Sequence, residues 1–105
     1  MAEPTLSQVF GSNSSQSNTQ VFLDKEDLGL SAESSAEQIF AAIIVRASIY
    51  FNESEQVNNS DIQIIIEQGF TSLVSRNDLT YREKQRIIKF QKQDDESDEI
   101  IPEDY

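Results

Sequence analysis

The sequence contains no cysteine, histidine or tryptophan, and only three glycines and two prolines among its 105 residues. Without cysteine there can be no disulfide framework, no thiolate zinc site and no cysteine nucleophile, and without histidine there can be no histidine-based triad. Hydrophobic residues make up 37% of the chain, which is low for a globular domain but too high for a wholly disordered one. The length fits about one small domain. The composition therefore points to a binding or structural protein.

Charge is unevenly distributed along the chain. The net charge is −11, from 19 acidic and 8 basic residues, and seven of the acids lie between Asp94 and Tyr105, where no basic residue occurs. We do not expect direct nucleic-acid binding, because its affinity depends on neutralising phosphates. Residues 93–105 are predicted to form an acidic, disordered tail. This tail is either a solubilising end or, since it includes Ile100, Ile101 and Tyr105, a short motif that docks on a basic groove.

A basic stretch precedes the tail. Its candidate contact residues are Arg82, Lys84, Arg86 and Lys89, and together with Arg76 and Lys92 they outnumber the acids Asp78 and Glu83 by four. One interpretation is a solvated face of a strand or helix. The other is a contact for an acidic neighbour, either the chain's own tail or that of another copy.

The start of the sequence does not have the basic and apolar regions of a secretory signal peptide. The longest apolar run, Ile39 to Val45, is seven residues long and too short to span a bilayer. We therefore expect no membrane association, and a protein that is made and assembled in a cytoplasm.

Residues 1–20 are predicted to be a flexible, polar N-terminal arm. Residues 12–20 contain only Ser, Asn, Gln and Thr, which cannot bury enough surface to offset their ordering entropy. Ahead of them, however, Leu6, Val9 and Phe10 form a small apolar cluster. This cluster either docks on another subunit and orders only on assembly, or folds back on the chain's own core.

The middle of the chain is predicted to begin with a strand at residues 21–23 and to continue as a long helix. Capping-box pairs occur at Ser34/Glu37 and again at Ser35/Gln38, and the helix is expected to end at about residue 50. Its apolar residues recur at the helical period and cover more than half of its circumference, so the helix is expected to be mostly buried. Polar residues 53–61 are expected to form a loop.

The second half favours two antiparallel strands, at about residues 61–75 and 81–91, joined by a turn at residues 76–80. Gly69 would then mark a bulge or bend. The predicted fold is a single α+β domain, residues 21–92, with one long buried helix packed on a small antiparallel sheet with a long hairpin. The alternative is a three-helix bundle, since the same segments also fit a helical period.

Two features favour a homo-oligomer or a component of a larger assembly. The predicted core is small, and domains of this size often gain stability by association. The long hairpin also has edges that must be covered or paired.

An enzyme is not expected. The paired carboxylates lie in polar sequence, where nothing pushes their pKa values apart as acid–base catalysis requires. The acidic tail lacks the glycine and terminal glutamate of a calcium loop, and no glycine-rich phosphate loop is present. We therefore assign no catalytic residue, no metal and no cofactor.

Several stretches, in this order, resemble small virion structural proteins of cyanobacterial tailed phages and prophage-like elements. The resemblance covers about residues 5–91, and the stretches that carry it are Leu6-Ser-Gln-Val-Phe-Gly11, residues 21–30, the Ser-Ala-Glu-Gln helix start, Leu73-Val-Ser-Arg-Asn77, Thr80-Tyr81 and Ile87-Ile-Lys-Phe90. It implies a non-enzymatic subunit of a phage tail, neck or baseplate, which assembles through its arm and sheet. The acidic tail lies outside this pattern. The alternative function is a soluble acidic adaptor or regulator, such as a nucleic-acid mimic that binds a basic partner protein.

Overall fold

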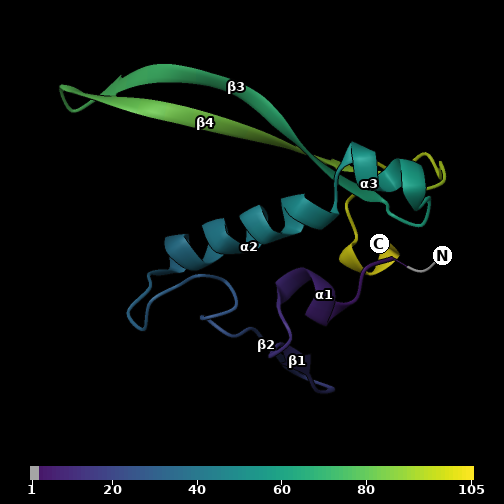
Figure 1. The fold of residues 1–105 in the computed structure, drawn as a ribbon. Coiled ribbons are helices and arrows are strands. Elements are labelled where there is room, and N and C mark those ends of the chain that lie inside the picture. The colour runs from purple at the N-terminus through teal and green to yellow at the C-terminus, as the bar shows by residue number, and fades with distance from the viewer. Residues whose placement is uncertain (1–2) are drawn as a thin grey trace.

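The computed structural model describes residues 3–105 as an α+β chain built around one helix and one long hairpin (Figure 1). The predicted fold class is confirmed, and the three-helix alternative is not what forms. The elements in chain order are α1 (Leu6–Phe10), β1 (Ser15–Gln16), β2 (Val21–Phe22), α2 (Ala36–Tyr50), α3 (Glu53–Asn58), β3 (Ile64–Arg76), β4 (Leu79–Phe90) and the 3-10 helix η1 (Pro102–Asp104).

Helix α2 begins at the second of the two predicted capping boxes. The Ser35 hydroxyl accepts from the Gln38 amide at 3.2 Å, and the Gln38 side chain accepts from the Ser35 amide at 2.7 Å. These two bonds satisfy backbone donors that a helix start otherwise leaves free. The helix ends at Tyr50, as predicted.

The helix is less buried than its sequence indicated. None of its residues is buried, and Phe40, Val45 and Ile49 are exposed. The reason is that few elements cover it: α1 packs on one side, and β3 reaches it only near its C-terminal end, where the Ile66 amide donates to the Phe51 carbonyl at 2.9 Å.

The β3–β4 hairpin is built by local sequence signals. Asn77 and Asp78 form its two-residue turn with φ of 53° and 62°, a left-handed conformation that these two residue types tolerate. The pairing shifts by one residue between Gln68 and Thr71, so a bulge lies at Gly69, as predicted. A side chain at Gly69 would also crowd the opposite strand, because an added Cβ would lie 2.9 Å from the Cβ of Gln85.

Two segments differ from their predicted roles. Strand β2 pairs with β1, inside the predicted flexible spacer, and both belong to a sheet separate from the hairpin. The predicted loop at residues 53–61 contains helix α3 instead. Asn52 caps this helix by accepting a hydrogen bond from the Glu55 amide at 2.9 Å. Acidic residues in its first turn further stabilise the helix, because they lie at the positive end of its dipole.

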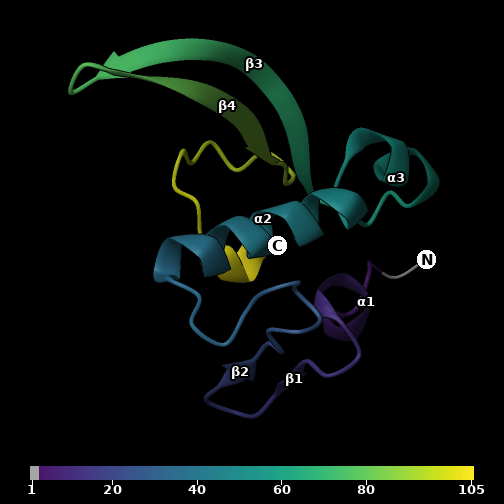
Figure 2. The same ribbon diagram turned by 60° about the vertical axis from the view of Figure 1, so that its left-hand side comes forward.

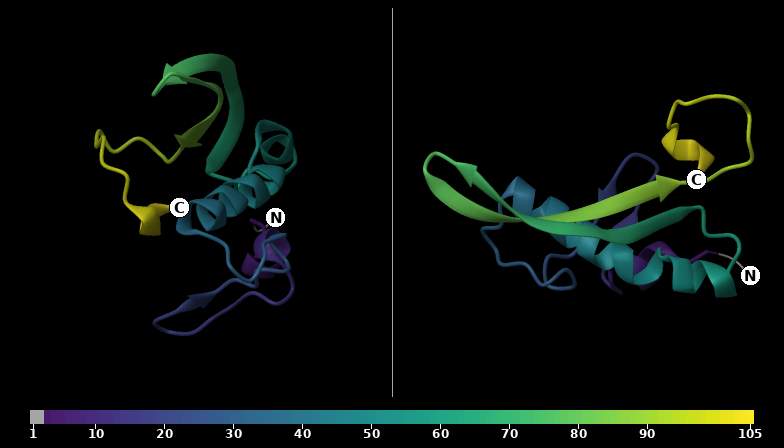
Figure 3. Two further views of the ribbon diagram at one scale, coloured as in Figure 1. Left: turned by 90° about the vertical axis from the view of Figure 1, so that its left-hand side faces the viewer. Right: turned by 90° about the horizontal axis from the view of Figure 1, so that it is seen from above.

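The buried apolar side chains of residues 3–105 come from α1 and from the base of the hairpin. They are Val9 of α1, Ile62 just ahead of β3, and Ile65 and Ile66 of β3. From its base the hairpin arches over α2, and its turn extends beyond the N-terminal end of the helix (Figures 1, 2 and 3). The result is an elongated molecule, with principal extents of 49 × 36 × 26 Å.

Candidate protein-binding site

The N-terminal candidates lie against the chain's own helix. Leu6, Val9 and Phe10 belong to α1, whose start is capped by Thr5, and Val9 is buried. The side chain of Arg46, on α2, donates to the Val9 carbonyl at 3.0 Å. Of the two arrangements that the sequence left open, the structure has the one in which this cluster folds back on its own core. Val9 is therefore not free to contact a partner.

The four basic candidates lie on β4 and divide between its two faces. Because side chains alternate along a strand, Arg82, Lys84 and Arg86 share one face, and Lys89 lies on the other. Lys89 donates to the Glu67 carboxylate at 2.8 Å. This hydrogen bond and the charge of Glu67 raise the pKa of Lys89 above its usual value. The positive charge of Lys89 is thus balanced by Glu67 of the same chain.

The other three basic residues keep an uncompensated charge. No carboxylate within residues 3–105 forms an ion pair with Arg82, Lys84 or Arg86. Their cross-strand partners are uncharged as well: Leu73 lies opposite Arg82, and Gln68 lies opposite Arg86. This row of three cations, which we call the cationic face, is therefore available to an acidic ligand.

The cationic face borders a groove of about 370 Å³ between the hairpin and α2. Lys84 and Arg86 line it from the hairpin, and the helix contributes a mostly apolar floor, made of Ala41, Ile44, Val45 and Ser48. Such a groove suits a ligand that carries apolar and acidic groups side by side.

Sequence analysis missed the floor of this groove, because it assigned the apolar residues of α2 to the core. One signal was present in the sequence. The apolar stripe of the helix is wider than half of its circumference, which is more than one small sheet can cover.

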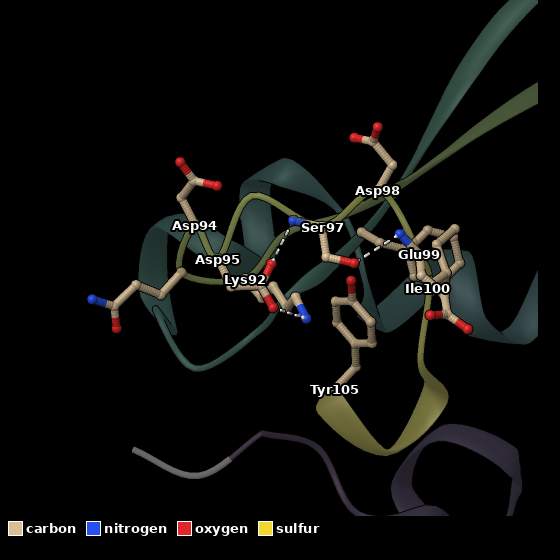
Figure 4. Close-up of a pocket in the computed structure, with 10 residues that line it drawn as sticks. Lys92, Asp94, Asp95, Ser97, Asp98, Glu99, Ile100 and Tyr105 are labelled. Carbon is tan, nitrogen blue, oxygen red and sulfur yellow. Dashed lines mark hydrogen bonds and ion pairs between the residues drawn. The ribbon is translucent and has the colours of Figure 1, made fainter.

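The C-terminal candidates lie in a closed loop at the end of β4. Lys92 contacts Asp95 at 2.9 Å and Asp104 at 2.8 Å, and the Tyr105 ring packs edge-on against Phe90 with ring centroids 5.4 Å apart. The loop borders an open pocket of about 330 Å³, which Tyr105 lines (Figure 4).

The charges of this loop support one another. Hydrogen bonds to Asp104 and Asp95 raise the pKa of Lys92 well above its ordinary value. The hydrogen bond from Lys92, helped by the Ser97 amide, lowers the pKa of Asp95. Both shifts show that the ionised forms are favoured. They move the two pKa values away from neutrality, whereas a general acid or base needs a pKa close to it.

The loop also carries exposed apolar side chains, and carboxylates without an ion-pair partner among the described residues. Ile100 and Ile101 are about half exposed. Five of the seven carboxylates make no ion pair within residues 3–105: Asp94, Glu96, Asp98, Glu99 and Glu103. In Figure 4, Asp94 and Asp98 point away from the Tyr105 ring.

In residues 3–105, no three acidic side chains gather in an arrangement that could hold a metal ion. No helix in the same range has the length and hydrophobicity needed to cross a membrane.

Comparison of the chain with protein-family models, curated proteins and solved structures finds no match.

Proposed function

We propose that this chain is a non-enzymatic structural subunit of a homo-oligomeric protein assembly, of the kind found in phage-like particles. It acts through protein–protein contacts, and the hairpin is its main interface. The observation that carries the proposal is the large apolar surface that the hairpin and α2 leave uncovered.

The size of the accessible surface supports this proposal. The chain exposes 8341 Å². A compact monomer of 11.9 kDa is expected to expose about 5,900 Å², so the excess is about 2,400 Å². The radius of gyration, 16.3 Å, is likewise larger than the value of about 13 Å typical of a compact chain of this length. An obligate interface buries about 2,000–5,000 Å² in total, or about 1,000–2,500 Å² from each partner, so the excess is enough for one such interface.

The chemistry of the exposed hairpin supports it further. Phe70 is 82% exposed and Leu73 is 63% exposed, and Leu79 at the turn is exposed as well. Leu73 shares a face with Arg82, whereas Leu79 lies on the opposite face, so large apolar side chains are uncovered on both faces of the hairpin. Both edges of the two-stranded sheet also carry unpaired backbone groups that another strand can use.

The resemblance to phage virion proteins is the second support. It includes residues 73–77 and 87–90, which belong to the two strands of the hairpin. An assembling subunit accounts for a hairpin that extends beyond the chain's own core.

The test is the mass of the chain by light scattering, from micromolar to near-millimolar concentration. We expect the mass to rise well above 11.9 kDa. The variant Phe70→Asp should lower it toward that of a monomer, because it places a charge in the interface. The matched control is Val57→Asp, since Val57 is 85% exposed but lies on α3, outside the hairpin. A wild-type chain that stays monomeric throughout would contradict the proposal. An unchanged mass in the Phe70 variant would show that the hairpin is not the interface.

A further inference from the structure

The groove between α2 and the hairpin pairs an apolar floor with positive charge. Ile44 and Val45 provide the floor, while Lys84 and Arg86 stand on the hairpin side. No residue of the chain's own acidic segment lines the groove. It therefore calls for a ligand in which aliphatic side chains and carboxylates are neighbours.

Residues 93–105 of this same chain have that chemistry. Ile100 and Ile101 are exposed and adjacent to Asp98 and Glu99, which make no ion pair in the described part of the chain. Hydrophobic and acidic groups thus lie together on one loop. The hydrophobic groups match the apolar floor of the groove, and the acidic groups are opposite in charge to its two basic residues.

Within one copy, this loop is held away from the groove. Lys92 binds Asp95 and Asp104, and Tyr105 packs on Phe90. Phe90 lies six residues beyond Lys84, which is about 20 Å along an extended strand. The ties fix the loop at the base of the hairpin, whereas the groove lies over the middle of α2.

We propose that the groove binds the acidic loop, residues 93–105, of a second copy of this chain. Ile100 and Ile101 lie on the α2 floor, and the free carboxylates lie against Lys84 and Arg86. This inference rests on the assembly role proposed above. It extends that role by naming the partner, a second copy of the chain, and the contact between the two copies. It also gives the acidic loop a function in assembly.

The test is a charge exchange between the two surfaces, read by the dissociation constant for self-association in sedimentation equilibrium at low ionic strength. The groove variant is Lys84→Glu/Arg86→Glu, and the loop variant is Asp98→Lys/Glu99→Lys. Each variant alone should self-associate about tenfold more weakly or worse, because like charges then face each other. A mixture of the two variants should regain association, because the wild-type loop of one variant then faces the wild-type groove of the other, and the two reversed surfaces also carry opposite charges.

The matched control for the groove variant is Lys25→Glu/Ser54→Glu/Val57→Glu. It changes the net charge by the same amount, but none of the three residues lines the groove or belongs to the hairpin. We expect this control to associate far more strongly than the groove variant. Recovery in the mixture would also establish that both charge variants fold, because a misfolded variant has no complementary surface to offer.

The outcomes separate this inference from the proposed function. If the groove variant associates like the control, or if the mixture does not recover, the loop-in-groove contact is wrong. The assembly role would then still stand, provided that Phe70→Asp lowers the mass. If a salt-sensitive contact between loop and groove forms within single copies, independent of concentration, the loop binds its own groove and the inference is overturned. If the wild-type chain does not associate at all, both proposals fail.

Discussion

The bulge at Gly69 divides the hairpin into two parts with different surroundings. On the near side, Ile64–Gln68 pair with Arg86–Phe90, and Ile65 and Ile66 are buried. On the far side, residues 71–76 pair with residues 79–84, and none of them is buried. The backbone pairing is the same kind of antiparallel ladder in both parts. The difference teaches that hydrogen bonding alone does not make this hairpin part of the core, and that within residues 3–105 the far part is held only by the pairing of its strands and by its turn.

The largest expected effect tests which part contributes to the stability of the isolated chain. Ile66→Ala should lower the free energy of unfolding by about 2–5 kcal/mol, because it leaves a cavity among buried side chains. Leu73→Ala, its counterpart in the far part, should cost about 0.5 kcal/mol or less in a dilute monomer. Urea unfolding followed by circular dichroism measures both. Equal losses of unfolding free energy in the two variants would contradict the distinction between the near and far parts of the hairpin.

A second, smaller effect is expected at the boundary between the parts. Gly69→Ala should cost about 1 kcal/mol or more, because the new Cβ would lie 2.9 Å from the Cβ of Gln85 and the strands must move apart. The cost should shrink when the same substitution is made in a Gln85→Gly background, which removes the opposing Cβ. The four unfolding free energies of this double-mutant cycle give the coupling. A cost that is the same in both backgrounds would mean that Gln85 is not the obstacle.

A third effect concerns the turn that closes the far part. Asp78→Gly should stabilise the hairpin, because glycine adopts the left-handed conformation of this position without steric cost. The gain should be only about a few tenths of a kcal/mol, because glycine also loses more conformational entropy on folding. The control Ser75→Gly places glycine in the strand and should destabilise it. Amide exchange of Leu79 and Tyr81, which belong to the hydrogen-bonded pairs next to the turn, reports on both variants. Faster exchange in the Asp78 variant than in the wild type would contradict the expectation.

The smallest effect is a pH dependence confined to the acidic loop. Hydrogen bonding to Lys92 lowers the pKa of Asp95 below 3.8, so the loop's closed form is stabilised above that pH and loses this stabilisation as the pH falls through the lowered pKa. At the alkaline end, the pKa of Lys92 is raised above 10.5, so its ion pairs persist up to pH 10.5 and are lost only as the pH rises through the raised pKa.

Nuclear magnetic resonance shifts of the Tyr105 ring, which packs on Phe90, follow this opening. The near part of the hairpin should not respond, because Ile65 and Ile66 do not titrate. In Lys92→Gln the acid step at Tyr105 should disappear. If the variant keeps the wild-type pH profile, Lys92 is not what closes the loop.

Features set by neighbouring residues could be predicted. The cap of α2 is specified by Ser35 and Gln38, and the turn by Asn77 and Asp78, because each depends on hydrogen bonds or dihedral preferences within a few residues. The bulge at Gly69 belongs to the same group. Helix α3 was missed because its cap, Asn52, lies just ahead of the segment assigned to a loop.

Of the candidate site residues, the sequence singled out both surfaces of the proposed contact but not their geometry. It named Lys84 and Arg86 on the hairpin and Ile100 and Ile101 on the loop, since their charge and hydrophobicity stand out from their surroundings. It did not separate Lys89, which pairs with Glu67, from the basic residues that remain free, because an ion pair depends on which strand faces which.

By itself, the sequence determined helix α2 and the uneven distribution of charge and favoured the hairpin strands with their turn and bulge, but it did not predict α1, β1 or α3. Helical period, alternation, capping and turn preferences are local properties, and they act before the chain is folded. The tertiary structure alone decided that α2 lies half uncovered, that β2 pairs with β1, and that Lys84 and Arg86 stand over an apolar floor. These outcomes depend on how much apolar surface each element can bury against the others, which is a property of the whole chain and not of any segment within it.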